Sequence, residues 1–457
     1  MKKAVQEPVF EFELTKDFRD RFQQALDARD SAFIKESLEG IKAVDITALL
    51  YEFNSQESKY VLDLLALELQ AEIINDLDPE TRKNYLKVYQ PEEIAVFLNL
   101  LDSDDVADIL HELPVKIREQ VLSGLGHELR GQVTELLRYE ENVAGGLMAK
   151  ELIKARVHWT VVQCIEEIRK QAENVSKFYA VYVVDDEDKL LGRAALQDLI
   201  ISDARTIVGD ICERDITSVE TFLEDWEVAE IMRKYDLESV PVVNVQGQLV
   251  GRITIDDVVD VITEQAEEER QLMTGISEDV EEDDSVWRNT RARLPWLLIG
   301  IAGGLMNAKF MGLFEGELAR VTAIAFFTPL IQATGGNVGI QSSSLIVQSL
   351  ANPDFVDEGL WKRLVKVFFV AVLNGIFLAT LVLGANIVLF GEYSLSIVVS
   401  IALFSVIIFA SFVGTVTPLI LNRYGYNPAL AAGPFITTIN DLLGLTVYFF
   451  TVHLLLQ

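Results

Sequence analysis

One carboxylate lies deep inside the last long apolar segment of the chain. Asp441 is the only acidic residue after Glu392, and the fifteen residues from Leu442 to Leu456 carry no formal charge. At membrane depth a carboxylate costs about 3 kcal/mol unless it meets water, a cation or a hydrogen-bonding partner. Pro434, about two turns earlier, lacks a backbone N–H and predicts a kinked or broken helix with free carbonyl oxygens. This combination can bind a hard cation; the simpler alternative is a buried acid bonded to a nearby Thr or Asn.

A second polar segment, TPLIQATGGNVGIQSSS, interrupts an earlier apolar stretch. Its proline and glycines predict a discontinuous helix, and its amides would lie at membrane depth. These residues are Pro329, Gly335, Gly336, Gly339, Asn337 and Gln341. Alone, the pattern fits a kinked packing helix equally well. Together with Pro434 and Asp441 it predicts two interrupted polar spans in one small bundle, which is typical of a transport path.

Charge is divided unevenly along the 457 residues. Of 70 acidic and 39 basic side chains, only seven and six lie from Pro295 onward. This division predicts an acidic soluble front and a membrane-embedded back. Such a front attracts cations and excludes nucleic acid as a partner.

Two cysteines, Cys164 and Cys212, are too few for a disulfide scaffold or a thiolate metal site and suit a reducing cytosol. The first residues, MKKAVQEPVFEFEL, lack the apolar core of a signal peptide.

The acidic front predicts more than one domain. Residues 1–30 are expected to form a loose lead-in, and residues 31–142 to form short helices in an α-superhelical domain, because apolar residues recur at three- and four-residue steps. Within residues 143–262, AVYVVDDEDKLLGRAALQDLI recurs 59 residues later as SVPVVNVQGQLVGRITIDDVV. Each copy reads as strand, turn, strand and Asp-capped helix. The pair resembles tandem α/β CBS domains, either as a scaffold without ligand or as a site for an adenine nucleotide.

The residues that follow lead into the membrane half. Between Glu264 and Asp284 there are ten acids and one Arg, which fits a solvated or disordered linker and equally a connecting helix over 263–290. Residues 291–457 contain five apolar stretches long enough to span a bilayer. They are Leu294–Leu313, Val321–Leu350, Leu364–Phe390, Leu395–Leu421 and Pro428–Leu456. Lys and Arg flanking these stretches predict a cytoplasmic front and an outside C-terminus.

Taken as a whole, the chain resembles the MgtE-type family of magnesium channels over nearly its full length. The resemblance rests on the order of the segments and on two membrane motifs, P-x₅-GGN-x-G-x-Q and N-P-A-x₃-G-P-x₅-N-D. It implies a multidomain membrane protein that is a Mg²⁺-selective channel with inward flux. It further implies a homodimer in the lipid of the bacterial inner membrane, with a five-helix transmembrane domain and the pore between subunits. A plug helix and a cytosolic sensor would close the pore, so Mg²⁺ would be both transported and regulatory.

Matched position by position, the resemblance assigns two groups of residues. In the pore, the Asp441 carboxylate would hold Mg²⁺ through its water shell, helped by the Thr437 carbonyl and the Asn337 side chain. The pore would be shaped by Gly433, Pro434, Gly335, Gly336 and Pro329. The sensor acids would be Asp104, Asp108, Glu224, Asp236, Asp257, Asp260, Glu268 and Glu269. Gln265 stands at a usually acidic position, where Glu264 or Glu267 would have to substitute, so the number of sensor ions stays open.

Elementary electrostatics supports such a gate. Two carboxylates ~6 Å apart repel by about 2.8 kcal/mol at an effective dielectric of ~20, and a bridging Mg²⁺ removes that cost and stabilises a compact, closed arrangement. An inside-negative potential supplies about 4.6 kcal/mol per divalent ion for each 100 mV, so inward flux needs no ATP.

The runner-up function is a proton-coupled secondary transporter of divalent cations that uses Asp441. An enzyme is disfavoured, because the sequence has no HExxH motif of a zinc hydrolase and no second well-placed membrane carboxylate for an aspartyl protease. An ATP-driven pump is disfavoured because there is no Walker motif. Selectivity among Mg²⁺, Mn²⁺, Co²⁺ and Ca²⁺ stays open.

Overall fold

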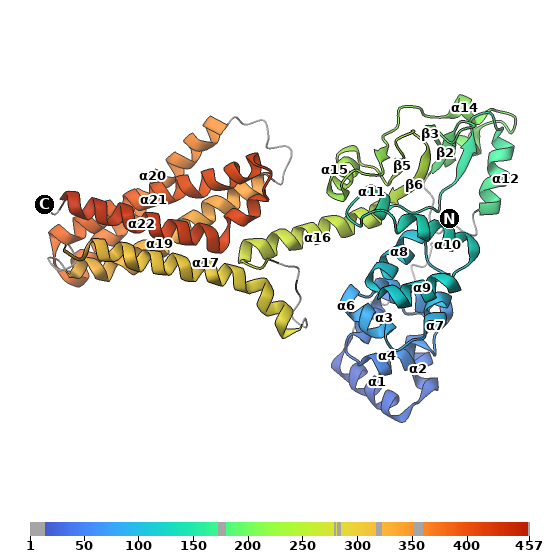
Figure 1. The fold of residues 1–457 in the computed structure, drawn as a ribbon, viewed down its shortest axis with the longest axis horizontal. Coiled ribbons are helices and arrows are strands. Elements are labelled where there is room, and N and C mark those ends of the chain that lie inside the picture. The colour runs from blue at the N-terminus through green and yellow to red at the C-terminus, as the bar shows by residue number, and fades with distance from the viewer. Residues whose placement is uncertain are drawn as a thin grey trace, which may run out of the picture. The chain divides into compact units, whose positions relative to one another are not determined.

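The computed structural model describes residues 14–171, 180–277, 280, 285–316, 322–350 and 360–455. The chain divides into two compact units, residues 1–262 and 263–457. The first unit combines a helical stack with two small sheets, and the second is built from long helices (Figure 1).

The helical stack of the first unit consists of ten short helices. Helices two places apart along the chain pack together, as in α3 with α5, α5 with α7 and α7 with α9. This is the pairing of a superhelical stack, as the apolar periodicity predicts. The helices are α1 Lys16–Ala28, α2 Ser31–Leu38, α3 Ala43–Leu50, α4 Ser55–Leu62, α5 Leu67–Asp76, α6 Pro79–Leu86, α7 Pro91–Leu98, α8 Ser103–Glu112, α9 Val115–Gly124 and α10 His127–Leu136.

Helix α1 corrects the expectation of a loose lead-in over residues 1–30. The Thr15 hydroxyl caps the helix by accepting a hydrogen bond from Phe18 N at 3.3 Å. Phe22 is fully buried, and its ring centroid lies 5.8 Å from that of Phe18 and 5.6 Å from that of Phe53. An apolar stripe at helical spacing therefore orders the segment by burial, despite its polar composition. Residues 1–13 of the expected lead-in lie outside the described residues.

Phe22→Ala is expected to destabilise the first unit by about 3–5 kcal/mol, because it removes a fully buried aromatic ring. The measurement is thermal unfolding of the full chain, followed at the transition of the first unit. Phe222→Ala removes the same ring at a position that is 68% exposed and serves as the matched control. Equal effects of the two substitutions would show that α1 is not part of the folded core.

Two three-stranded sheets confirm the repeat. In each sheet the first strand pairs parallel and the third antiparallel to the central strand. Val183 lies opposite Gly192 in one sheet, and Val242 lies opposite Gly251 in the other. The strands are β1 Lys154–Arg156, β2 Ala180–Val184, β3 Leu190–Ala195, β4 Val219–Glu220, β5 Ser239–Val243 and β6 Leu249–Thr254. The helices around them are α11 Ala144–Leu147, α12 Val161–Gln171, α13 Leu196–Ile201, α14 Val208–Ile211 and α15 Asp225–Tyr235.

The two sheets meet through equivalent residues. Lys189 and Gln248, which correspond in the repeat, form an antiparallel bridge. Leu190 N donates to Gly247 O at 3.0 Å, and Leu249 N donates to Asp188 O at 2.9 Å. The reciprocal bonds show that the repeats pair about an approximate twofold axis, so the two copies form one module.

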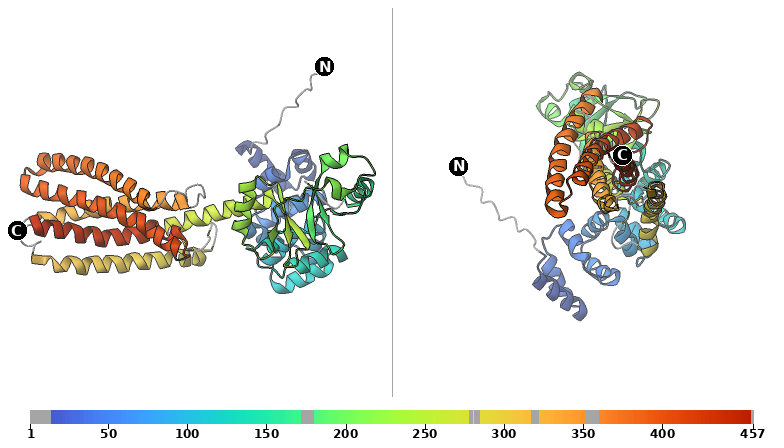
Figure 2. Two further views of the ribbon diagram at one scale, coloured as in Figure 1. Left: turned by 90° about the horizontal axis from the view of Figure 1, so that it is seen from above. Right: turned by 90° about the vertical axis from the view of Figure 1, so that its left-hand side faces the viewer.

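The second unit is a bundle of long helices (Figures 1 and 2). Helix α16, Ile255–Thr274, runs across the division between the units. The remaining helices are α17 Val286–Leu313, α19 Ala323–Leu350, α20 Leu360–Phe390, α21 Tyr393–Arg423, the 3₁₀ helix η2 Pro428–Ala431 and α22 Gly433–Leu455. Among the described residues, four segments are long and apolar enough to span a membrane. They are Val286–Leu313, Trp361–Phe390, Tyr393–Arg423 and Pro428–Leu455, whereas α19 falls short because of its amides and serines.

Helix α19 corrects the expectation of a discontinuous span, because it is one continuous helix across Pro329 and the glycines. Pro329 cannot donate to the carbonyl four residues earlier, that of Ala325. The Thr328 hydroxyl donates to that same Ala325 O at 2.8 Å. The local sequence thus supplies the missing donor, and only one of the two expected interruptions is present.

The remaining interruption lies between η2 and α22. Pro434 stands in the first turn of α22, where a missing N–H costs little, so the chain breaks before this proline. The break is at Ala432 and Gly433, and Gly433 has a positive φ of 56°.

The connecting helix is shorter than the predicted range of 263–290. It ends at Thr274, the last residue of α16, and Gly275 follows with φ 86°.

Candidate metal sites

Asp441 lies on the face of α22 that packs against α19. A Cβ built on Gly336 would lie 3.8 Å from Asp441 Oδ1 and 3.4 Å from Thr437 Cγ2. Asp441 and Thr437 thus share one face of α22, at four-residue spacing, opposite the glycines of α19. Asp441 is half-buried, so its carboxylate is partly open on this face.

The threonine hydroxyls beside Asp441 do not donate hydrogen bonds to its carboxylate. Thr437 Oγ1 donates to Gly433 O at 2.9 Å, and Thr438 Oγ1 donates to Pro434 O at 2.8 Å. Within the described residues no donor is bonded to the Asp441 carboxylate. The alternative of an acid bonded to a nearby Thr is therefore wrong for both threonines, and the carboxylate is available to an ion.

The other two predicted pore ligands are the Thr437 carbonyl and the Asn337 side chain, and neither one is a free group inside the bundle. Thr437 is inside α22, so its carbonyl already takes part in the helical hydrogen-bond pattern and offers its second lone pair. Asn337 is exposed, next to Gly336 on α19. The site therefore opens toward the outside of the single bundle.

Glycines bring the two site helices into contact. A side chain at Gly339 would collide with the amide of Asn440, and one at Gly414 on α21 would collide with Gly339 O. A Cβ on Gly335 would lie 3.1 Å from Val406 Cγ1. The glycine motif therefore acts in close packing of a continuous helix, as small residues do between membrane helices.

Two residues of this site escaped the sequence reasoning. Asn440 is 1% exposed, and neither polar atom of its side chain has a partner among the described residues. Ser343 is fully buried, and its hydroxyl donates to Ala431 O at 3.0 Å, at the break before α22. The signals available in the sequence were the Asn-Asp pair and the serine run after the glycine motif.

The end of α16 packs on the start of α22. Gly433 leaves no room for a Cβ beside Met273 O, and a Cβ on Gly275 would lie 2.6 Å from Pro434 Cγ. Leu272 joins Val347 of α19 and Ala429 of η2 in a small buried cluster. Two positive-φ glycines therefore permit a close backbone contact between α16 and the broken segment that precedes Asp441.

A second group of carboxylates lies in the first unit, between the helical stack and the CBS pair. Glu151 caps α8 from outside the stack: its Oε2 accepts from Ser103 N at 3.2 Å and from Ser103 Oγ at 2.8 Å. Asp104 follows in the first turn and is 9% exposed. Asp257 caps the start of α16, where Oδ2 accepts from Thr254 N at 3.0 Å and from Thr254 Oγ1 at 2.8 Å.

These carboxylates affect one another. Burial, and then the charges of Asp105 and Asp257, raise the pKa of the Asp104 carboxyl well above its usual range. Burial raises the pKa of Asp105 to about 6. Asp108 lies on the same helix and is exposed. Burial also raises the pKa of Asp257. Desolvated like charges favour a proton or a cation between them.

The other predicted sensor acids are dispersed. Glu224 precedes α15 and Asp236 follows it, so twelve residue steps along the helix put them roughly 18 Å apart. Asp260 is exposed, and burial followed by the charges of Asp256 and Asp76 raises its pKa. Glu268 and Glu269 lie further along α16. Within the described part of the chain, no three His, Cys, Asp or Glu side chains converge on a metal position.

Without divalent cations, the first unit is expected to lose stability as pH rises. The pKa values of Asp104 and Asp105 are raised in the folded state. The folded state therefore binds more protons than the unfolded state above about pH 4, and its free energy of unfolding falls as pH rises through the folded pKa values. Thermal unfolding of the full chain in EDTA should show a midpoint several degrees lower at pH 7.5 than at pH 5, since 1 kcal/mol corresponds to about 2–4 °C in a domain of this size.

Asp105→Asn should flatten this pH dependence, whereas Asp215→Asn, which changes an exposed carboxylate, should leave it unchanged. An unfolding midpoint in EDTA that is equal at pH 5 and pH 7.5 would contradict the electrostatic account of this cluster.

The site and the fold together define a class of protein. Residues 328–451 match the family described as a divalent cation transporter. Residues 41–142 match the MgtE intracellular N domain, and residues 143–204 and 208–264 match the CBS domain. The apolar helical bundle that carries Asp441, preceded by these domains, is that of a divalent cation transporter.

Full-length relatives narrow the class to one family. The chain is 35% identical over 446 residues to the magnesium transporter MgtE of Thermus thermophilus, which covers 95% of this chain and 98% of the relative. It is 31% identical over 442 residues to the magnesium transporter MgtE of Enterococcus faecalis, covering 90% and 97%. The chain belongs to the MgtE family of magnesium transporters, whose named function is not enzymatic.

A solved structure is similar to the first part of the chain. It is the crystal structure of the cytosolic domain of the Mg²⁺ channel MgtE in complex with ATP, with a TM-score of 0.50 and 36% sequence identity. The match covers 53% of this chain and 99% of that one.

Proposed function

We propose that this chain is the subunit of a Mg²⁺ channel whose pore site is built on Asp441. The observation that carries the proposal is the half-buried Asp441 carboxylate of α22, which faces the glycines of α19 in an apolar bundle and has no bonded donor among the described residues. Mg²⁺ dehydrates reluctantly, so the carboxylate would accept hydrogen bonds from the ion's water shell. Thr437 and Asn337 would contribute further oxygens, and Gly335, Gly336, Gly433, Pro329 and Pro434 would fix the helices around the site.

The pore is proposed to form between two subunits. Asp441 is only half-buried and Asn337 is exposed, so the site is open on a face that a second copy would close. Five spans are proposed, α19 being the fifth, because its polar face would be sheltered in the dimer. Lys362, Lys366 and Arg423 would place the first unit on the cytoplasmic side of the inner membrane and the C-terminus outside.

The end of α16 is proposed to act as the plug. It packs on η2 and on the start of α22, two turns or more before Asp441, through Gly275, Gly433 and Leu272. Mg²⁺ bound among acids of the first unit and α16 would hold this closed arrangement by removing carboxylate repulsion. The proposed sensor acids are Asp104, Asp108, Asp257, Asp260, Glu224, Asp236, Glu268 and Glu269. Loss of Mg²⁺ would release α16 and allow inward flux.

Adenine nucleotide is proposed as a second regulatory ligand of the CBS pair. The support is the solved cytosolic domain of an MgtE channel in complex with ATP, which is 36% identical to this chain. The paired repeats, joined through Lys189 and Gln248, provide the corresponding module here. Removal of nucleotide would then alter the Mg²⁺ concentration that closes the channel.

Asp441→Asn is expected to reduce Mg²⁺ influx into proteoliposomes by roughly tenfold or more, because hydrogen bonds to a charged group are worth about 1.5–3 kcal/mol. The measurement uses a Mg²⁺ indicator inside the vesicles at low Mg²⁺ on the cytoplasmic face. Glu392→Gln removes the exposed acid before α21 and should retain wild-type flux. Normal influx through the Asp441 variant would move the ion site elsewhere.

Gly433→Ala is expected to weaken closure by Mg²⁺. An alanine there adds strain at positive φ and collides with Met273 O of α16, and left-handed backbone costs about 1–2 kcal/mol. Influx measured against cytoplasmic Mg²⁺ should need a higher concentration for half-closure. Gly425→Ala introduces similar backbone strain at φ 77°, with no atom within 4 Å of the new Cβ. This control variant should reach half-closure at the same Mg²⁺ concentration as wild type. A Gly433 variant that closes normally would remove α16 from the gate.

A proton-coupled transporter is the competing function, because a single membrane carboxylate can also carry a proton. Recording vesicle pH during Mg²⁺ influx separates the two mechanisms. A channel predicts no proton movement that is stoichiometric with Mg²⁺, whereas a fixed ratio of protons to Mg²⁺ would replace the channel by the coupled transporter.

A further inference from the structure

A buried amide lies one residue before Asp441 in α22. Asn440 is 1% exposed, and neither polar atom of its side chain has a protein partner among the described residues. It belongs to a row of buried residues at four-residue spacing, between Ile436 and Gly444. Burying an amide without a hydrogen bond is destabilising. Such a group beside the proposed pore acid therefore needs an explanation of its own.

The amide fills a tight, apolar contact of three helices. A Cβ on Gly339 of α19 would collide with Asn440 Nδ2 and lie 2.9 Å from its Cγ. Val406 of α21 occupies the adjoining space, since its Cγ1 would lie 3.1 Å from a Cβ on Gly335 and 3.5 Å from a Cβ on Gly444. The amide thus takes the place of the side chain that Gly339 lacks, beside glycine and valine.

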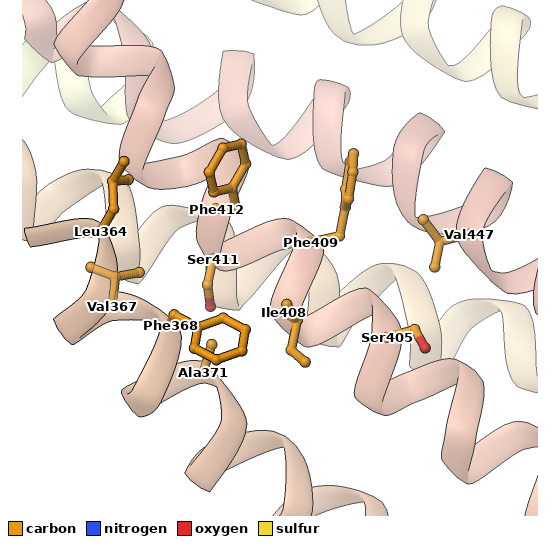
Figure 3. Close-up of a pocket in the computed structure, with 10 residues that line it drawn as sticks. All are labelled: Leu364, Val367, Phe368, Ala371, Ser405, Ile408, Phe409, Ser411, Phe412 and Val447. Atoms are coloured by element: carbon orange, nitrogen blue, oxygen red, sulfur yellow. The ribbon is translucent and has the colours of Figure 1, made fainter. Parts of the chain in front are cut away.

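Hydroxyl groups of the neighbouring helices are engaged or lie elsewhere. Ser343 of α19 donates to Ala431 O at 3.0 Å. Ser405 and Ser411 of α21 line a separate apolar groove beside α20 (Figure 3). With these hydroxyls away from the amide, a movement of α22 against α19 is the simplest way to give Asn440 a hydrogen-bonding partner.

The start of α22 permits such a movement. The helix begins after the break at Gly433, about two turns before Asn440. The end of α16 occupies this break here, since a Cβ on Gly433 would collide with Met273 O. Successive residues of a helix are 100° apart. A rotation of α22 by less than this angle would bring the Asn440 amide to the face where Asp441 meets water or a cation.

We propose that Asn440 is a positioning residue of the gate, which destabilises the arrangement with α16 packed on α22. When α16 leaves, α22 turns and the amide bonds to water on the Asp441 face. This inference rests on the proposed closure by α16 and adds the term that opposes it. Mg²⁺ bound by the first unit must offset the unpartnered amide, so Asn440 raises the Mg²⁺ concentration at which the channel closes.

Asn440→Leu keeps the branched shape of the side chain and removes its polar atoms. In saturating Mg²⁺, the unfolding midpoint of the second unit in the purified full chain is expected to rise by about 2 °C or more. In proteoliposomes, the Mg²⁺ concentration for half-closure is expected to fall roughly threefold or more. Asn422→Leu makes the same change at an exposed position in the last turn of α21 and should alter neither value.

Gly339→Ala should act in the opposite direction. The new Cβ collides with Asn440 and forces α22 away from α19, so half-closure should need roughly threefold more Mg²⁺ or above. Gly304→Ala places its Cβ with no atom within 4 Å and serves as the control. Because the two site variants shift closure in opposite directions, a general loss of folding cannot imitate both results.

The outcomes separate this inference from the proposed function. A lower midpoint for Asn440→Leu would show that the amide is bonded in this arrangement, for example by a buried water, and would overturn the inference. A higher midpoint with unchanged half-closure would overturn the link to the gate. Wild-type flux that Mg²⁺ does not close would reject the proposed gating itself, and the midpoint would still test the cost of the amide.

Discussion

The rest of the structure depends on the cost of one carboxylate in apolar surroundings. Asp441 has no bonded donor among the described residues, and the two nearest threonine hydroxyls are used by backbone carbonyls. A charge in this position is stable only if water or a cation reaches it. The bundle must therefore provide a wet path on the face where α22 meets the glycines of α19.

That requirement explains the local architecture. Gly336 and Gly339 bring α19 close to α22, and Ser343 stabilises the break before α22 by donating to Ala431 O. The break carries Gly433 at positive φ, which lets the end of α16 approach the same segment. In the proposed mechanism, the carboxylate cluster around Asp104 and Asp257 transmits the Mg²⁺ concentration to that helix. Burial, and then the charges of neighbouring acids, raise the pKa values of these two carboxyls.

The sequence could predict features that depend on single residues or exact repeats. The lone charge of Asp441 predicted the proposed pore site, and the 59-residue repeat predicted two equivalent strand-turn-strand units, which the two sheets confirm. It could not predict the continuity of α19, because that depends on the Thr328 hydroxyl replacing a donor lost at Pro329. It also missed α1, whose order comes from burial of Phe22 against Phe53, and the partnerless amide of Asn440, which only tertiary packing against Gly339 reveals.

The most direct test of the central claim is the reversal potential of the current through the reconstituted protein in a planar bilayer. A Mg²⁺ channel predicts a reversal potential that follows the Mg²⁺ gradient by about 30 mV per tenfold change, as for any two-charge process. It also predicts no shift when a pH gradient is imposed. A reversal potential that moves with the pH gradient would contradict the account and make Asp441 a proton carrier in a coupled transporter.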